Sequence, residues 1–152
     1  MSGRKFSFEI NRTSTAPAAT LFRLVADGAN WSKWGKPIIV QSSWARQGDP
    51  PPDGVGAVRK LGMWPVLVQE ETVAYERDRR HAYKMVGRSP VDDYFAEVLF
   101  TPNPAGGTDI RWIGSFVEKV PGTGPAFQAA LGGAVRYFAG RLVKAAERES
   151  GR

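Results

Sequence analysis

Apolar and polar residues alternate near the start of the chain, between Lys5 and Thr13. Phe6, Phe8 and Ile10 lie on one side of this segment, and the residues between them are polar or charged. A period of two predicts a β-strand with one buried face. Further strands are expected over residues 37–46, 55–61, 66–75, 81–86, 94–101 and 108–118. The linkers between them are short and carry turn residues, which favours an antiparallel meander over parallel crossovers.

Two short helices are expected between the first strand and the second. Ser14 or Thr15 can cap the first helix with its hydroxyl, and Pro17 suits a first helical turn. Residues 21–25 supply an apolar face for this helix. A second short turn is expected around residues 30–34, where two tryptophans stand three positions apart and therefore on the same side.

The period changes to three or four after residues 121–125. The apolar positions of this last segment are Phe127, Leu131, Ala134, Phe138, Leu142 and Ala145. Such spacing predicts an amphipathic helix of about six turns. No other element is long enough to cover the apolar face of a curved sheet. We therefore expect a single α+β domain over residues 1–152, with the sheet wrapped around the C-terminal helix.

Composition and charge narrow the function classes. The 152 residues are 42% apolar and 24% charged, as in one folded domain. The net charge is +6, but the cations are spread along the chain, so nucleic-acid binding is not expected. No run reaches the roughly 18 apolar residues of a membrane span, and the start of the chain lacks the apolar stretch of a secretory signal. Cysteine is absent, which removes disulfides and thiolate chemistry and fits a cytoplasmic location.

Several short segments, taken in order, resemble the SRPBCC superfamily and within it the polyketide cyclase/dehydrase-like group. These segments are residues 11–18, 31–34, 54–59, 69–83 and 106–112. The resemblance covers nearly the whole chain and implies a START-like helix-grip fold. In that fold a seven-stranded antiparallel sheet surrounds a long C-terminal helix, with a deep cavity between them. Members bind lipids, sterols, polyketides and other hydrophobic molecules, and some catalyse cyclisation or dehydration. The superfamily has no universal catalytic motif.

Strand and helix phase suggest which side chains face such a cavity. The candidate ligand-binding residues are Tyr83, Met85, Tyr94, Val98, Trp112, Phe127, Leu131 and Phe138. Tyr83, Tyr94 and Trp112 combine an apolar body with a hydrogen-bond donor, which suits them to orient a ligand. The alternative is that these aromatic side chains simply fill a core, as aromatic stripes usually do.

Acidic and basic candidates are few. Glu71 shares a strand face with Val73 and is the candidate catalytic group, because a buried carboxylate can act as a general acid or base. A structural ion pair, or a register that places Glu70 inside instead, is the alternative. His81 is the only histidine, and its polar neighbours predict a surface position. We expect no metal site and no cofactor, because ligand clusters and nucleotide-binding glycine motifs are missing.

Three functions stay open at this point. The first is binding or transport of a small hydrophobic molecule such as a lipid, a polyketide or an aromatic metabolite. The second is a cyclase or dehydratase in which Glu71 and a tyrosine act as acid/base groups. The third is an interaction module that uses the basic face of the last helix, with Arg136, Arg141, Lys144 and Arg148. Homodimer formation is open in each case.

Overall fold

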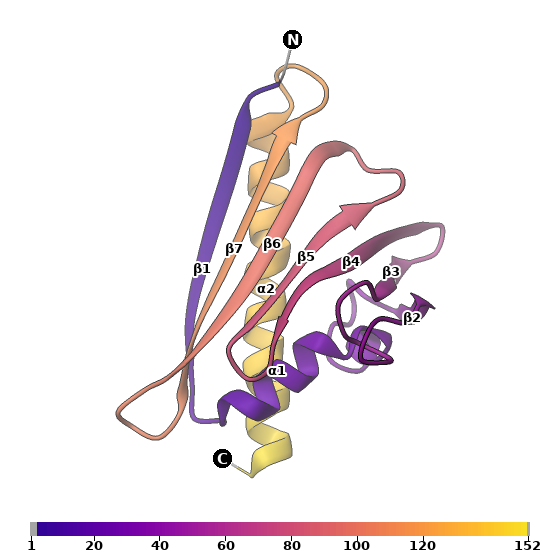
Figure 1. Cartoon of the computed structure of the whole chain (residues 1–152). Coiled ribbons are helices and arrows are strands. Elements are labelled where there is room, and N and C mark those ends of the chain that lie inside the picture. Colours follow the sequence, from indigo (N-terminus) through magenta and orange to yellow (C-terminus); the bar gives the residue numbers. More distant parts are fainter. Residues whose placement is uncertain (1–2, 152) are drawn as a thin grey trace.

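The chain folds as one curved sheet with a long helix along one face (Figure 1). The computed structural model describes residues 3–151, so the ends of the expected domain, residues 1–2 and 152, lie outside the described part. The elements are β1 (Lys5–Ser14), α1 (Ala18–Ala26), the 3₁₀ helix η1 (Gly28–Lys33), β2 (Gln41–Arg46), β3 (Val58–Met63), β4 (Val66–Glu76), β5 (Arg80–Val86), β6 (Val91–Pro102), β7 (Thr108–Glu118) and α2 (Gly124–Ser150). The strand order is β1-β7-β6-β5-β4-β3-β2, and every pairing is antiparallel. The α+β helix-grip fold is therefore confirmed.

Two local predictions differ from the structure near the first helices. The second strand begins at Gln41 rather than at residue 37. Residues 34–38 form turns instead, and the amide of Ile39 donates to the carbonyl of Gly35. Pro37 has no amide hydrogen to donate to a neighbouring strand. The first helix has no side-chain cap. The Ser14 hydroxyl instead accepts from the amide of Ala16 and donates to Glu147, which ties the start of α1 to α2.

Strand phase in the second half of the sheet agrees with the alternation in the sequence. Tyr94, Ala96, Val98 and Phe100 are buried on β6, and the residues between them are more exposed. The same holds for Ile110, Trp112 and Phe116 on β7. These side chains face α2, which buries Phe138, Ala139 and Leu142 against them.

Aromatic rings fill much of the space between the sheet and the helices. The ring of Trp31 lies 6.0 Å from that of Trp112 and 5.7 Å from that of Phe138, both edge-on. Each such ring buries about 150–250 Å² and contributes strongly to the core. The Trp31 indole nitrogen also donates to the carbonyl of Val25 at 2.9 Å. Trp31 therefore packs between α1, the sheet and α2.

Candidate functional site: an apolar cavity with one carboxylate

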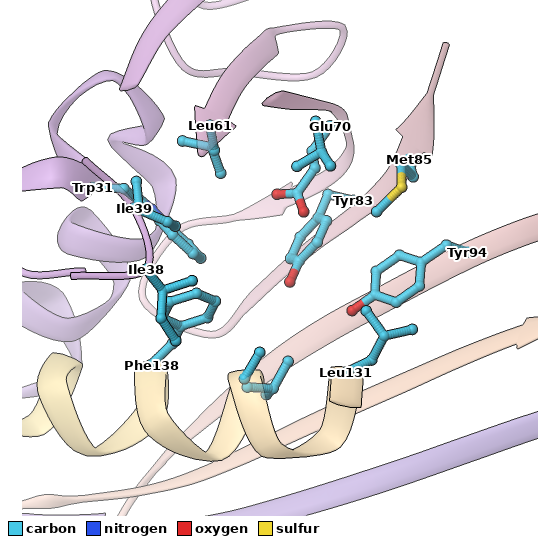
Figure 2. A pocket seen from close by; sticks show the side chains of 13 residues that line it. Trp31, Ile38, Ile39, Leu61, Glu70, Tyr83, Met85, Tyr94, Leu131 and Phe138 are labelled. Atoms are coloured by element: carbon cyan, nitrogen blue, oxygen red, sulfur yellow. The ribbon is translucent and has the colours of Figure 1, made fainter. Parts of the chain in front are cut away.

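A cavity of about 170 Å³ lies between the sheet and α2 (Figure 2). The sheet contributes Leu61, Val68, Glu70, Tyr83, Met85 and Tyr94. Helix α2 contributes Leu131, Ala134, Val135 and Phe138. Trp31 and the segment before β2, with Ile38 and Ile39, close the remaining side. Ile38 is nevertheless partly exposed, so this segment forms the rim of the cavity.

Among the described residues, Glu70 is the only charged side chain in the cavity lining. The expectation that Glu71 faces inward is wrong: Glu71 lies outside the lining and pairs with Arg46 on the other face, at 3.5 Å. The cause is a β-bulge between Thr72 and Ala74, where the pairing of β4 with β5 shifts by one residue. Before the bulge the even-numbered residues are inside. After it, the odd-numbered Tyr75 is inside and packs edge-on against Phe22. Counting back from Val73 in steps of two therefore selects Glu71 as the inward residue, although the bulge leaves Glu70 inside.

Glu70 is held by a buried arginine on the neighbouring strand. The Arg59 Nε donates to Glu70 Oε1 at 3.1 Å, and Arg59 Nη1 donates to the carbonyl of Val25 at 2.6 Å. The guanidinium lies between two aromatic faces, 4.3 Å from the centre of the Trp31 ring and 4.6 Å from that of Tyr83. A Cβ on Gly28 would overlap the Arg59 side chain, so this glycine leaves the space that the arginine occupies. Arg59 therefore positions the carboxylate and has little freedom to move away from it.

Burial raises the pKa of Glu70 above its ordinary value of 4.5, although the Arg59 charge acts in the opposite direction. Desolvation is the larger effect because the carboxyl group lies among apolar side chains. A carboxyl group of this kind exchanges a proton more readily near neutral pH than an exposed one.

Two tyrosine hydroxyls lie beside the carboxylate. Tyr83 accepts a hydrogen bond from the Trp112 indole at 3.3 Å, and its hydroxyl is also hydrogen-bonded to that of Tyr94. Burial raises the pKa of both tyrosines well above 10.0, so both hydroxyls stay protonated. Two hydroxyls that share one hydrogen bond keep one hydrogen to donate elsewhere. Figure 2 shows both hydroxyls and the Glu70 carboxylate directed into the space below the sheet.

Five of the eight candidate ligand-binding residues line the cavity, namely Tyr83, Met85, Tyr94, Leu131 and Phe138. The other three do not. Val98 and Trp112 are fully buried, and Trp112 instead supports the hydroxyl of Tyr83. Phe127, near the start of α2, packs against the core without lining the cavity. Phase identifies the inward face of a strand or helix, but not where along that face the packing leaves space.

Sequence reasoning missed several residues of the lining, including Trp31 and Leu61, and it named Glu70 only as the alternative to Glu71. The pattern Val68, Glu70, Thr72 is an alternation with every second residue inside, so it contains the signal for Glu70. A buried arginine at position 59 had no such signal, because a single cation in a strand usually lies on the exposed face.

His81 is fully buried, contrary to the surface position expected from its neighbours. Its ring packs against Phe22 and Tyr83, and its Nε2 lies 3.4 Å from the Thr72 hydroxyl. Its neighbour Arg80 points to the opposite face of β5, where it pairs with Glu97 and Glu76, as alternation requires. Burial, together with the charge of Arg59, lowers the pKa of His81 well below 6.5.

The buried imidazole predicts a specific pH dependence. Below about pH 6.5 the unfolded chain binds a proton at His81 and the folded protein does not. This histidine therefore lowers the free energy of unfolding as the pH falls from 6.5 to the folded-state pKa, by at most about 1.4 kcal/mol per pH unit. The raised pKa of Glu70 acts with the opposite sign, because its folded form takes up a proton first. Since His81 is the only histidine, its ring signals in an NMR titration give the pKa directly. A midpoint at or above 6.5 would contradict the buried environment.

Comparison with known proteins agrees with this architecture. Residues 5–147 match the family described as polyketide cyclase / dehydrase and lipid transport, and the chain belongs to that family. No curated protein matches the sequence. Within residues 3–151, no helix has both the length and the apolar character needed to cross a membrane. The same residues contain no group of three or more histidine, aspartate or glutamate side chains arranged to hold a metal ion.

Three solved structures have the same fold at low identity. One domain of similar shape occurs in BexL, the di-domain ARO/CYC of the BE-7585A biosynthetic pathway, with a TM-score of 0.76, 19% identity, and coverage of 94% of this chain and 50% of that one. A protein from Nitrosospira multiformis has a TM-score of 0.73 and 19% identity, over 97% of this chain and 100% of that one. Ara h 8.0201 has a TM-score of 0.68 and 18% identity, over 93% and 99%. The family and the fold thus support hydrophobic-ligand binding or cyclase roles as a class.

Proposed function

We propose that the protein binds one small, mainly apolar molecule that carries a hydrogen-bond donor or a basic nitrogen. The observation behind this proposal is the single carboxylate of Glu70 in an otherwise apolar cavity that closes against α2. A donor on the ligand satisfies the free carboxylate oxygen, and the remaining tyrosine hydrogen can bond to a ligand oxygen. The rest of the ligand replaces water against aliphatic and aromatic side chains.

The volume of the cavity limits the size of the ligand. An apolar protein cavity of about 150 Å³ accommodates benzene, and the cavity here measures about 170 Å³. A one-ring compound with a short substituent therefore fits. Sterols, phospholipids and multi-ring polyketides exceed this volume. Among the ligand classes of the family, an aromatic metabolite of one ring suits the cavity best.

A panel of one-ring probes tests the proposal. Benzylamine, phenol and toluene are titrated into the wild-type protein and into Glu70→Gln, with binding measured by calorimetry and by thermal shift. Loss of the carboxylate is expected to weaken benzylamine binding about 10- to 100-fold, the range for a hydrogen bond to a charged group. Toluene binding is expected to stay unchanged, because it depends on volume alone. If no probe binds saturably, or if benzylamine and toluene lose the same affinity in Glu70→Gln, the proposed role of Glu70 is contradicted.

An enzymatic function is the second candidate, with Glu70 in place of Glu71. Glu70, Tyr83 and Tyr94 face one space, so a tyrosine hydroxyl can bind a carbonyl oxygen while Glu70 removes a proton from the adjacent carbon. Hydrogen–deuterium exchange at that carbon, in a small aromatic ketone, measures this step. Exchange catalysed by the wild type and lost in Glu70→Gln with binding retained would support the enzyme over the carrier.

The interaction-module hypothesis has less support. A filled interior would favour it, whereas the structure has a cavity. Of the cations named for it, Arg141 is half-buried and donates to the carbonyl of Trp34, so this side chain also has a structural role.

A further inference from the structure

The turn between β3 and β4 lies at the margin of the molecule (Figure 1), and it carries large exposed apolar side chains. Trp64 is 75% exposed, Val66 72% and Met63 57%. The segment before β2 lies alongside this turn, since the amide of Val40 donates to the carbonyl of Gly62. Val40 and the rim residue Ile38 are exposed as well. Single exposed apolar residues are ordinary, but a group of five on adjoining segments marks an interaction surface.

The apolar surface of this turn continues into the cavity. Met63 pairs with Val66 across the β3–β4 ladder, and the next pair on the same face is Leu61 with Val68. Leu61 and Val68 line the cavity. The apolar face of the hairpin is therefore continuous from the exposed turn to the cavity lining.

Three exposed cations lie near this turn. Val66 and Val68 share a shallow surface hollow with Arg88 and Lys119, both exposed. Lys60 is exposed on the outer face of β3. In the sequence, residues 28–48 and 54–69, which form the turn and its neighbouring segments, contain no aspartate or glutamate. Within these two ranges the charged side chains are therefore all cations.

We infer that the β3–β4 turn docks on the surface of a lipid bilayer that contains anionic lipids. Tryptophan is the side chain most suited to the interfacial region, where its ring enters the acyl boundary and its N–H stays near water. Methionine and valine beside it add apolar contact, and the surrounding cations attract anionic headgroups. A protein partner would also cover apolar side chains, but an exposed tryptophan in a turn beside a hollow lined by Arg88 and Lys119 fits a lipid surface better. The docking stands independently of which molecule the cavity binds.

Vesicle flotation tests this inference with the full chain. Vesicles of phosphatidylcholine with and without phosphatidylglycerol are mixed with the wild type and with the double variant Met63→Ser/Trp64→Ser. The wild type is expected to bind the anionic vesicles, more weakly as salt increases. The double variant is expected to lose at least about tenfold in partition coefficient, equivalent to about 1.4 kcal/mol. Arg88→Gln should weaken binding to anionic vesicles only.

Val120→Ser is the matched control, since Val120 is 57% exposed at a position outside the β3–β4 turn. This variant should bind vesicles like the wild type. Melting temperatures confirm that each variant is folded, and toluene uptake in solution shows whether the cavity is intact. Equal vesicle binding by wild type and double variant would overturn the inference, as would a wild type that binds no vesicle. Self-association that depends on Trp64 without vesicle binding would overturn it in favour of a protein partner.

Discussion

Glu70→Leu is expected to lower the free energy of unfolding by about 3–5 kcal/mol, the range for removing one partner of a buried ion pair. The substitution leaves the Arg59 guanidinium charged and buried between Trp31 and Tyr83, with no carboxylate to compensate it. Arg59 cannot reach solvent, because its whole side chain is enclosed. Urea denaturation of the wild type and the variant measures the difference.

The double variant Arg59→Met/Glu70→Leu separates two contributions to the free energy of unfolding. One is the destabilisation by an unpaired buried charge, and the other is the net stabilisation by the ion pair. With both charges gone, the apolar replacements should recover most of the stability lost in the single variant. Such recovery would mean that the pair is retained for the chemistry of the cavity rather than for stability. If the single and double variants were equally unstable, the packing of the side chains, not the buried charge, would account for the loss.

Ala134→Phe is expected to abolish probe uptake by filling the cavity from the α2 side. Ala134 lines the cavity, and a phenyl ring at this position occupies most of the space that a one-ring ligand requires. Affinity for toluene and benzylamine should fall by at least about 100-fold, or about 2.7 kcal/mol. The free energy of unfolding should stay the same or rise by about 1 kcal/mol, as for other cavity-filling substitutions. Calorimetric titration and urea denaturation of the same preparation measure both quantities.

Ala129→Phe is the matched control for this substitution, because Ala129 is an exposed position of the same helix. It adds the same ring outside the cavity and should leave probe affinity unchanged. If Ala134→Phe also bound the probes like the wild type, the binding site would lie elsewhere and the proposed function would be wrong.

The two strands that precede α2 show how well the alternation of apolar and polar residues predicts which side chains face inward. On β6 from Tyr94 to Phe100 and on β7 from Ile110 to Phe116, each inward position is apolar or small, and the phase stays the same because the register shift of β6 lies near its start, between Asp92 and Phe95. The bounds of β7 were therefore predicted correctly as residues 108–118. In strand β4 the bulge lies in the middle of the strand, between Thr72 and Ala74, so the inward set changes from even to odd numbers beside the two glutamates. A bulge has no sequence signal as clear as a glycine or proline turn, so the inward glutamate was misidentified.

Periodicity in the sequence by itself determined the order of the elements, the inward faces of the last strands and the long C-terminal helix, because period and turn chemistry act locally. The tertiary structure decided which inward residues border empty space and which are packed. It also decided that Glu70 is inside, and that a buried arginine and a neutral histidine lie behind it. These outcomes depend on side chains from α1, η1 and β3–β5 meeting in three dimensions, since the pairing of Arg59 with Glu70 compensates a burial that neither residue tolerates alone.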